Sequence, residues 1–304
     1  MKRTVLITGA GGFVGSHMAE GFLAMGDAVI ALDTLFDAPT RQRLGGASLI
    51  EAGLTAAVLN NWGQIDLVIH GAAITTPPRD FGLSDDEHIQ ANVDLLAASL
   101  DIAKRHRARD FVFLSSSGVF SLDDGEGVHL ESMTPTGAIP YALAKRAGED
   151  ATAAASGSSL RAISIRLGPI YGPAEAPRST RMVVSQVRRW LDQVAQGEPI
   201  IVDMPDERRD WTFAPDLPRA LDALLRLEPK VSGVVHLTSA QACSNLELAK
   251  AVAGLVDSAA VVVRSSCAPA RLPMASDRMD LAALFVWTPL ATGLARIAAL
   301  EGIR

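Results

Sequence analysis

The first half of the chain is built from short apolar blocks separated by longer amphipathic ones. Six apolar runs rich in β-branched residues predict strands, at Thr4–Thr8, Ala28–Asp33, Leu67–His70, Phe111–Ser115, Ala162–Arg166 and Val231–Leu237. Runs that are apolar throughout, rather than at every second residue, are typical of a parallel sheet buried on both faces.

Helical periodicity fills the intervals between these strands. Phe13–Met25 and Ile89–His106 are the clearest examples, and in the second the apolar residues recur every three or four positions from Val93 to Ala103. Strands that alternate with helices predict an α/β fold, a doubly wound parallel sheet of the Rossmann type with right-handed crossovers.

Size, composition and charge exclude several classes of protein. The 304 residues suffice for one large domain, or for a domain with a smaller lobe. Hydrophobic residues make up 48% and charged residues 20%, as in ordinary globular proteins. The net charge of −6 argues against broad binding of nucleic acid or anionic membranes. Since no apolar stretch reaches about 18 residues, we also expect no transmembrane helix.

The N-terminal segment and the two cysteines bear on the compartment of the protein. The apolar run near the N-terminus is about five residues long, too short for a signal peptide. Cys243 and Cys267 form neither a disulfide framework nor a zinc site, and no His, Cys, Asp or Glu group has metal-ligand spacing. We therefore expect a reduced, cytoplasmic setting and no metal.

A glycine-rich loop follows the first predicted strand and leads into the first predicted helix. It reads TGAGGFVGSH from Thr8 to His17. A G-x-G-x-x-G pattern from Gly9 fails, whereas G-x-x-G-x-x-G fits Gly9, Gly12 and Gly15, which leaves Gly11 as a permissive residue of the turn. Glycines between a strand and a helix allow a pyrophosphate to approach the backbone and the helix N-terminus. The loop therefore predicts a dinucleotide site.

The identity of the dinucleotide follows from the end of the second predicted strand. Asp33 lies there, 18 residues after Gly15. A carboxylate at this position accepts hydrogen bonds from the adenosine ribose hydroxyls and repels a 2′-phosphate. This favours NAD over NADP as the cofactor.

The regular alternation ends after Arg166. Several prolines and a glycine interrupt the next segment, at Pro169, Gly172, Pro173 and Pro177. We expect residues 1–166 to form the NAD-binding Rossmann domain, with 215–239 returning to it. Residues 167–304 then form mainly a smaller substrate-binding lobe over the carboxyl edge of the sheet.

A second group of residues carries chemistry. The fourth predicted strand runs into three serines, Ser115–Ser117, and YALAK places Tyr141 and Lys145 four residues apart on one helix face. A lysine cation about 4 Å from a phenol lowers the phenol pKa from about 10 toward neutrality. Tyr141 then takes the proton of a substrate hydroxyl as hydride leaves its carbon, and a serine hydroxyl orients the reacting oxygen.

These segments together resemble a known family. TGAGGFVG, IHGAA, NVDLL, SSSGVF, YALAK, RLGPIYGP, RRDWTFAPDL and FVWTPLATGL are similar to motifs of the extended short-chain dehydrogenases/reductases, in the NAD-dependent epimerase/dehydratase group of nucleotide-sugar epimerases. The resemblance covers nearly the whole chain. It implies a small-molecule substrate, a sugar or nucleotide sugar, and a homodimer formed through the helices that contain Asn92–Ala103 and Tyr141–Ala153.

The resemblance also assigns site residues. The catalytic residues are Ser116, Tyr141 as the base, and Lys145. The implied cofactor contacts are Gly9, Gly12, Phe13, Val14, Gly15, Asp33, Ala72, Ala73, Asn92, Tyr141 and Lys145. The implied substrate contacts are Thr75, Ser116, Ser117 and Arg209, with Arg178, Arg181 and Arg271 as further candidates for an anion site.

Departures from the family pattern limit the substrate assignment. Ser117 and Gly118 stand where 4,6-dehydratases carry an Asp-Glu pair, so dehydration is poorly supported. Pro169 replaces an asparagine that holds the sugar nucleotide, and proline has neither an amide side chain nor an N–H. Three hypotheses stay open: a nucleotide-sugar epimerase, a net dehydrogenase of a small sugar, sugar acid or polyol, and a non-catalytic NAD-binding regulator. The presence of Ser116, Tyr141 and Lys145 together argues against the third.

Overall fold

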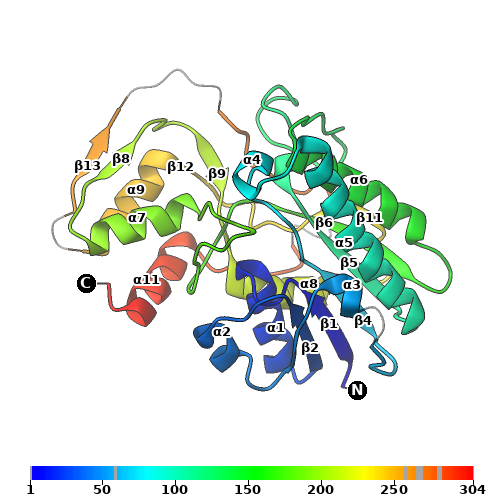
Figure 1. Ribbon diagram of the computed structural model, residues 1–304. Helices are drawn as coiled ribbons and strands as arrows, with labels where there is room; N and C mark the ends of the chain where they lie inside the picture. Colours follow the sequence, from blue (N-terminus) through cyan, green and yellow to red (C-terminus); the bar gives the residue numbers. More distant parts are fainter. Residues whose placement is uncertain (1, 58–59, 257–258, 265–269, 279–282, 304) are drawn as a thin grey trace.

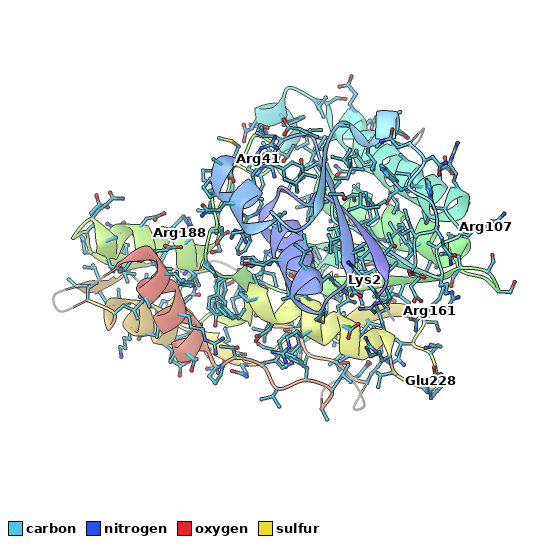
Figure 2. The ribbon with its side chains drawn as sticks, turned by 90° about the horizontal axis from the view of Figure 1, so that it is seen from below. Lys2, Arg41, Arg107, Arg161, Arg188 and Glu228 are labelled. Carbon is cyan, nitrogen blue, oxygen red and sulfur yellow. The ribbon has the colours of Figure 1, made fainter. Side chains whose placement is uncertain are left out.

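The computed structural model describes residues 2–57, 60–256, 259–264, 270–278 and 283–303. It consists of a large sheet domain with helices on both faces and a smaller lobe beside it (Figure 1). Figure 2, turned from that view, separates the lobe, where Arg188 is labelled, from the far end of the sheet domain, where Arg107 is labelled. Cys267, for which we predict a free thiol, lies outside the described residues.

The sheet domain is organised around seven parallel strands. They are β1 (Thr4–Thr8), β2 (Ala28–Asp33), β3 (Ser48–Glu51), β4 (Leu67–His70), β5 (Asp110–Ser116), β6 (Arg161–Leu167) and β11 (Gly233–His236). Their order is β11-β6-β5-β4-β1-β2-β3, and every neighbouring pair is parallel. The predicted doubly wound parallel sheet is confirmed. The strand order reverses beside β1, which places a crevice at the carboxyl ends of β1 and β4.

Helices bury both faces of this sheet. The residues of β1 alternate, since Val5 and Ile7 belong to the core under α1 (Phe13–Ala24) and α8 (Leu217–Leu225), whereas Leu6 belongs to the core under α5 (Asp85–Arg105). Next to α5 lies α6 (Pro140–Ala155) (Figure 1). Three shorter helices lie between these elements in the chain. Helix α2 (Ala38–Arg43) lies between β2 and β3, α3 (Leu54–Ala57) between β3 and β4, and α4 (Pro78–Phe81) between β4 and α5.

The lobe is assembled from segments that follow β6. Its helices are α7 (Gln186–Ala195), α9 (Asn245–Ala253) and α11 (Leu290–Glu301), and its strand pairs are β8 (Ile200–Val202) with β13 (Val261–Val263) and β9 (Arg208–Asp210) with β12 (Ala242–Ser244). A further pair, β7 (Ile170–Tyr171) with β10 (Thr212–Phe213), lies where the chain leaves and re-enters the sheet domain. Tyr171, Trp190 and Trp211 are buried in the lobe core.

Two features differ from the predicted elements for local reasons. Helix α5 begins at Asp85, four residues before the predicted start at Ile89, because Ser84 and Glu87 form a capping box that starts the helix in a polar segment. Strand β3 was not predicted, since a four-residue edge strand shows too little apolar pattern.

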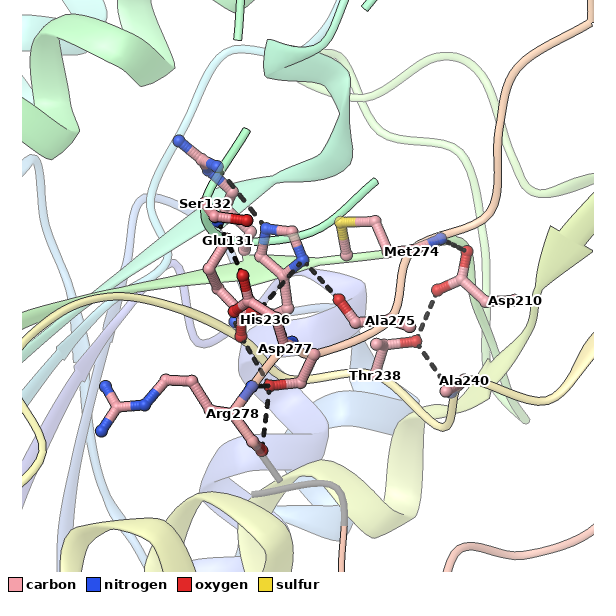
Figure 3. A network of polar contacts seen from close by, with 12 residues as sticks. Glu131, Ser132, Asp210, His236, Thr238, Ala240, Met274, Ala275, Asp277 and Arg278 are labelled. Carbon is pink, nitrogen blue, oxygen red and sulfur yellow. Dashed lines mark hydrogen bonds and ion pairs between the residues drawn. The ribbon is translucent and has the colours of Figure 1, made fainter. Parts of the chain in front are cut away.

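Polar contacts fasten the lobe to the sheet domain (Figure 3). Glu131, in the long connection after β5, accepts hydrogen bonds from the backbone N–H groups of His236 and Asp277 at 2.9 and 2.8 Å and from the Ser276 hydroxyl at 2.8 Å. Segment 270–278 is thereby held against the carboxyl end of β11. Among the helices of the described residues, none is both long enough and apolar enough to cross a membrane.

Candidate active site

A cavity of about 890 Å³ opens at the carboxyl ends of β1, β2, β4 and β5. Its size is ordinary for a ligand site in an enzyme. The lining comes from the glycine loop, the end of β2, segment 71–79, the end of β5, the start of α6 and segment 176–183. The predicted residues among its lining are Gly9, Gly12, Phe13, Val14, Gly15, Asp33, Ala72, Ala73, Thr75, Ser116, Tyr141, Lys145, Arg178 and Arg181.

The glycine loop is packed too closely against neighbouring backbone to carry side chains at Gly9 and Gly15. Gly9 has a φ of 71°, and a Cβ on it would lie 2.6 Å from the backbone nitrogen of Ala72. A Cβ on Gly15 would lie 2.1 Å from the carbonyl oxygen of Gly9. Gly12 precedes α1 without a side-chain cap, so the first-turn N–H groups of this helix face the cavity. These residues fit the pyrophosphate of a dinucleotide.

Gly11 is not a permissive residue, contrary to our expectation. A Cβ there would lie 2.2 Å from the carbonyl oxygen of Leu35, and its N–H donates a 2.9 Å hydrogen bond to Asp33 Oδ2. Gly11 therefore joins the loop to the end of β2. The sequence pattern could not show this, because the contact lies between two different loops.

The Asp33 carboxylate lies at the opposite end of the cavity from the serines. It accepts hydrogen bonds from the backbone N–H groups of Gly11, Thr34 and Leu35 at 2.9, 2.7 and 3.3 Å. It also forms an ion pair with Arg178, whose Nη2 lies 3.1 Å from Oδ1. Three fixed backbone donors hold the carboxylate in place at the position where an adenosine ribose is expected.

Ser116, Tyr141 and Lys145 are brought together at the other end. Gly118 lies between the first two, since a Cβ on it would be 3.3 Å from Ser116 Oγ and 3.2 Å from Tyr141 Cε1. The Lys145 ammonium is buried and donates a 2.7 Å hydrogen bond to the Leu114 carbonyl oxygen. It lies 5.7 Å from the centre of the Tyr141 ring.

The electrostatics differ from the sequence-based expectation. Burial raises the pKa of Tyr141, and the Ser116 hydroxyl and the positive charge of Arg181 oppose that rise. Burial also lowers the pKa of Lys145 to about 8, against the raising effect of Glu149. The predicted lowering of the tyrosine pKa by Lys145 is therefore wrong for this structure, because the ammonium faces the Leu114 carbonyl instead of the phenol.

Some predicted residues lie behind or outside the cavity. Asn92 holds the cavity wall, because its Oδ1 accepts from the N–H of Ile74 at 2.9 Å and its Nδ2 donates to the carbonyl of the same residue at 3.2 Å. Ser117 and Arg209 lie outside the lining residues. Arg209 pairs with Glu207 at 3.0 Å, and the backbone N–H of Arg271 donates to the same carboxylate at 2.9 Å.

A buried ion pair next to the site was missed at the sequence level. Glu149 binds Arg166 through both carboxylate oxygens, at 2.8 and 2.7 Å, and accepts a 2.6 Å hydrogen bond from the Ser115 hydroxyl. Arg166 also lies over the Phe120 ring, 5.0 Å from its centre. The position of Glu149, four residues after Lys145 on the same helix, was the available signal.

The fold and this cavity define a class of protein, a Rossmann-type enzyme that binds a dinucleotide at the switch point of its sheet. The sequence profile of the NAD dependent epimerase/dehydratase family matches residues 5–236. The chain therefore belongs to the NAD-dependent epimerase/dehydratase family and is an NAD-dependent enzyme.

Individual relatives agree with this membership. The chain is 26% identical over 259 residues to YtcB of Bacillus subtilis (strain 168), described as an uncharacterized UDP-glucose epimerase, covering 80% of this chain and 79% of that protein. It is 26% identical over 232 residues to UDP-glucuronate 4-epimerase 1 of Arabidopsis thaliana, covering 70% of this chain and 53% of that relative. The fold is similar to that in the solved structure of MoeE5 in complex with UDP-glucose and NAD, with a TM-score of 0.81 and 24% identity over 98% of each chain.

Proposed function

We propose that the protein is a nucleotide-sugar epimerase, which oxidises one hydroxyl of a sugar linked to a nucleoside diphosphate and reduces the ketone from the other face. The observation that carries the proposal is that Ser116, Tyr141 and Lys145 meet in the cavity that also contains the glycine loop and Asp33. The names of the two sequence relatives, both epimerases of UDP-sugars, support the substrate class.

The residues of the chain then have distinct tasks. The Tyr141 phenolic oxygen takes the proton of the substrate hydroxyl and later returns it, while the Ser116 hydroxyl holds the reacting oxygen in line. Lys145 fixes this end of α6 to β5 through the Leu114 carbonyl and contributes positive charge below the site. NAD, when bound, supplies the group that accepts a hydride from the sugar carbon and gives it back. Asp33 binds the adenosine ribose of the dinucleotide, and the first turn of α1 binds its pyrophosphate.

Two arginines of the lobe favour a substrate that carries a diphosphate. The Arg209 guanidinium pairs with buried Glu207, and Arg271 donates its backbone N–H to the same carboxylate; burial, together with the charge of Arg209, lowers the pKa of Arg271. Only the Arg209 guanidinium is paired with Glu207, so two arginine side chains within electrostatic range of one carboxylate leave an excess of positive charge, which an anion would balance. The pair is close to the cavity, because Asp210 follows Arg209 and its Oδ2 would lie 2.3 Å from a Cβ on Gly168, a lining residue.

Calorimetric titration tests the nucleotide part of the proposal. We expect UDP and UDP-sugars to bind the wild-type protein, and Arg209→Met to weaken that binding by about tenfold or more while NAD binding is unchanged. Arg208→Met is the matched control, since Arg208 is the exposed neighbour on the same strand. Failure of every nucleoside diphosphate to bind would contradict the proposal.

A net dehydrogenase of a small sugar, sugar acid or polyol is the second candidate. It is favoured by Pro169, which offers a nucleotide no amide, and by the position of Arg209 outside the lining residues. This enzyme would release its ketone, so NADH absorbance would accumulate in proportion to the substrate consumed. A screen of polyols and sugar acids that gives no NADH would exclude it.

We also propose a cytoplasmic homodimer. Helices α5 and α6 pack side by side, and their outer faces expose small or apolar residues, among them Ala97, Leu143 and Ala147. A second copy packed against this surface would remove these apolar side chains from water. Light scattering should give twice the mass of one chain for the wild type and the mass of one chain for Ala147→Glu; a monomeric wild type would contradict the dimer.

The cytoplasmic location is supported by Cys243, a free thiol, which suits a reduced cytoplasm.

A further inference from the structure

A segment of the lobe crosses the dinucleotide cavity. We call residues 174–183 the strap. On one side, the backbone N–H groups of Thr75 and Thr76 donate to the carbonyl of Thr180 at 2.8 and 3.1 Å, and the Thr76 hydroxyl donates to the carbonyl of Ser179 at 2.8 Å. On the other side, the strap reaches the end of β2 through Arg178. The strap therefore bridges the two walls between which the dinucleotide must lie.

The Arg178 guanidinium occupies the adenosine end of the cavity. Its Nη2 lies 3.1 Å from Asp33 Oδ1 and donates to the Leu35 carbonyl at 3.0 Å, and its Nη1 lies 3.3 Å from Asp33 Oδ2. The side chains of Arg178 and Asp33 are 19% and 11% exposed, so water screens the pair only in part. A Cβ on Gly12 would lie 3.7 Å from Nη1, which places the guanidinium over the glycine loop.

The acceptor capacity of Asp33 is already used. A carboxylate has about four lone-pair sites, and the backbone N–H groups of Gly11, Thr34 and Leu35 are fixed donors to this one. Ribose hydroxyls that bind Asp33 must therefore compete with Arg178. A guanidinium fork is well suited to a phosphate, which offers it more acceptor oxygens and more charge than a ribose hydroxyl does.

The further charges near this point are those of Asp37 and Arg43, and Arg43 is paired with Glu20 at 2.9 Å. The Asp37 carboxylate is within electrostatic range of Arg178 and Arg43, and it is held by the N–H of Thr40 at 2.7 Å as the cap of α2. Asp33 alone would repel a 2′-phosphate, but Asp33 paired with Arg178 presents little net charge.

We propose that Arg178 is a cofactor-selectivity residue, which offsets the charge of Asp33 so that the adenosine site accepts the 2′-phosphate of NADP as well as the ribose hydroxyls of NAD. The chain would then use NAD and also bind NADP. This inference concerns the dinucleotide and does not depend on the sugar substrate, so its test is independent of the test of the proposed epimerase activity.

Binding measurements on the full chain freed of dinucleotide test the inference. The dissociation constants of NAD⁺ and NADP⁺ are measured by calorimetry for the wild type, Arg178→Met and the control Arg189→Met, whose arginine lies exposed on α7. We expect the two constants of the wild type to agree within about tenfold. In Arg178→Met the ratio of the NADP⁺ to the NAD⁺ constant should rise by about tenfold or more, the loss expected for a charge-assisted contact. The control should keep the wild-type ratio.

Three outcomes would overturn the inference. They are no measurable NADP⁺ binding by the wild type, an unchanged ratio in Arg178→Met, and an equal weakening of both cofactors, which would mean that Arg178 merely closes the strap. Arg178→Lys, which keeps the charge and loses the fork, gives the same test if the methionine variant does not fold; its ratio should lie above that of the wild type.

Discussion

The buried ammonium of Lys145 is hydrogen-bonded to the carbonyl oxygen of Leu114, at 2.7 Å. This contact joins the strand that carries Ser116 to the helix that carries Tyr141. Leu114 lies two residues before Ser116 on β5, and Lys145 lies one helical turn after Tyr141 on α6. The bond therefore sets the separation between the serine and the tyrosine. It also keeps the lysine charge away from the phenol, so burial controls the pKa of Tyr141.

The pH dependence of turnover should report this lysine. Burial lowers the pKa of Lys145 to about 8, so the ammonium is charged below pH 8 and loses its charge above it, whereas an exposed lysine would stay charged to about pH 10. Because loss of the charge weakens the Lys145–Leu114 hydrogen bond that sets the separation of Ser116 and Tyr141, kcat/KM should fall as the pH rises through about 8. A pH–rate profile checks this, and a rate that stays level to pH 10 would contradict it.

Removal of the phenolic oxygen should separate chemistry from binding. Tyr141→Phe keeps the ring and its packing but removes the group that moves the proton. We expect turnover to fall by about two to four orders of magnitude. NAD binding, measured by calorimetry, should stay close to that of the wild type, since the glycine loop and Asp33 are untouched. A variant that kept most of its activity would show that Tyr141 is not the base.

The buried pair of Glu149 and Arg166 should matter for stability. Their side chains are 7% and 4% exposed, and Glu149→Gln would leave the guanidinium buried without its counter-charge. We expect the free energy of unfolding to drop by about 3–5 kcal/mol, measured by denaturant titration. Glu228→Gln is the control, because Glu228 pairs with Lys230 at the exposed surface. Equal stabilities for the two variants would refute the structural role of the buried pair.

Acid should destabilise the protein because His17 is buried in its neutral form. Burial lowers the pKa of His17 to about 4 from its ordinary 6.5, with a further lowering by the charge of Arg43. The folded state keeps His17 neutral while the unfolded chain takes up a proton, so stability is full above about pH 6.5 and is lost as the pH falls toward 4. His17→Gln keeps a donor for the Pro173 carbonyl, which His17 contacts at 3.0 Å. This variant should reduce the slope of unfolding free energy against pH by about 1.4 kcal/mol per pH unit; an unchanged slope would contradict the account.

Most of the sheet, but only part of the site, could be predicted from the sequence. Strands β1, β2 and β4 were predicted residue for residue, because buried parallel strands are continuously apolar and glycines or polar residues end them. Strand β3 and the start of α5 were missed, since a short edge strand and a polar first helical turn give little apolar signal.

Sequence analysis named Arg178 and Asp33 separately, but it missed the contacts that join such distant residues. Arg178 and Asp33 are 145 residues apart in the chain, and Thr76 and Ser179 are 103 apart. A spacing rule cannot find such pairs, because the lobe brings them together. The same limit explains the error on the tyrosine pKa, since the helix face was predicted but the Leu114 carbonyl that turns the lysine away was not. The roles assigned to Ser116, Tyr141 and Lys145 stay predictions.

The central claim is that a hydride leaves a sugar carbon and returns to the same carbon within one turnover. Its most direct test uses a nucleotide sugar labelled with deuterium at the carbon that is oxidised, incubated with the protein and bound NAD and followed by NMR. The account predicts that the epimer forms with the deuterium retained at that carbon and that no free reduced dinucleotide accumulates. An unlabelled epimer, deuterium in released NADH, or no conversion of any nucleotide sugar in a panel of UDP-, dTDP-, GDP- and ADP-sugars would contradict it.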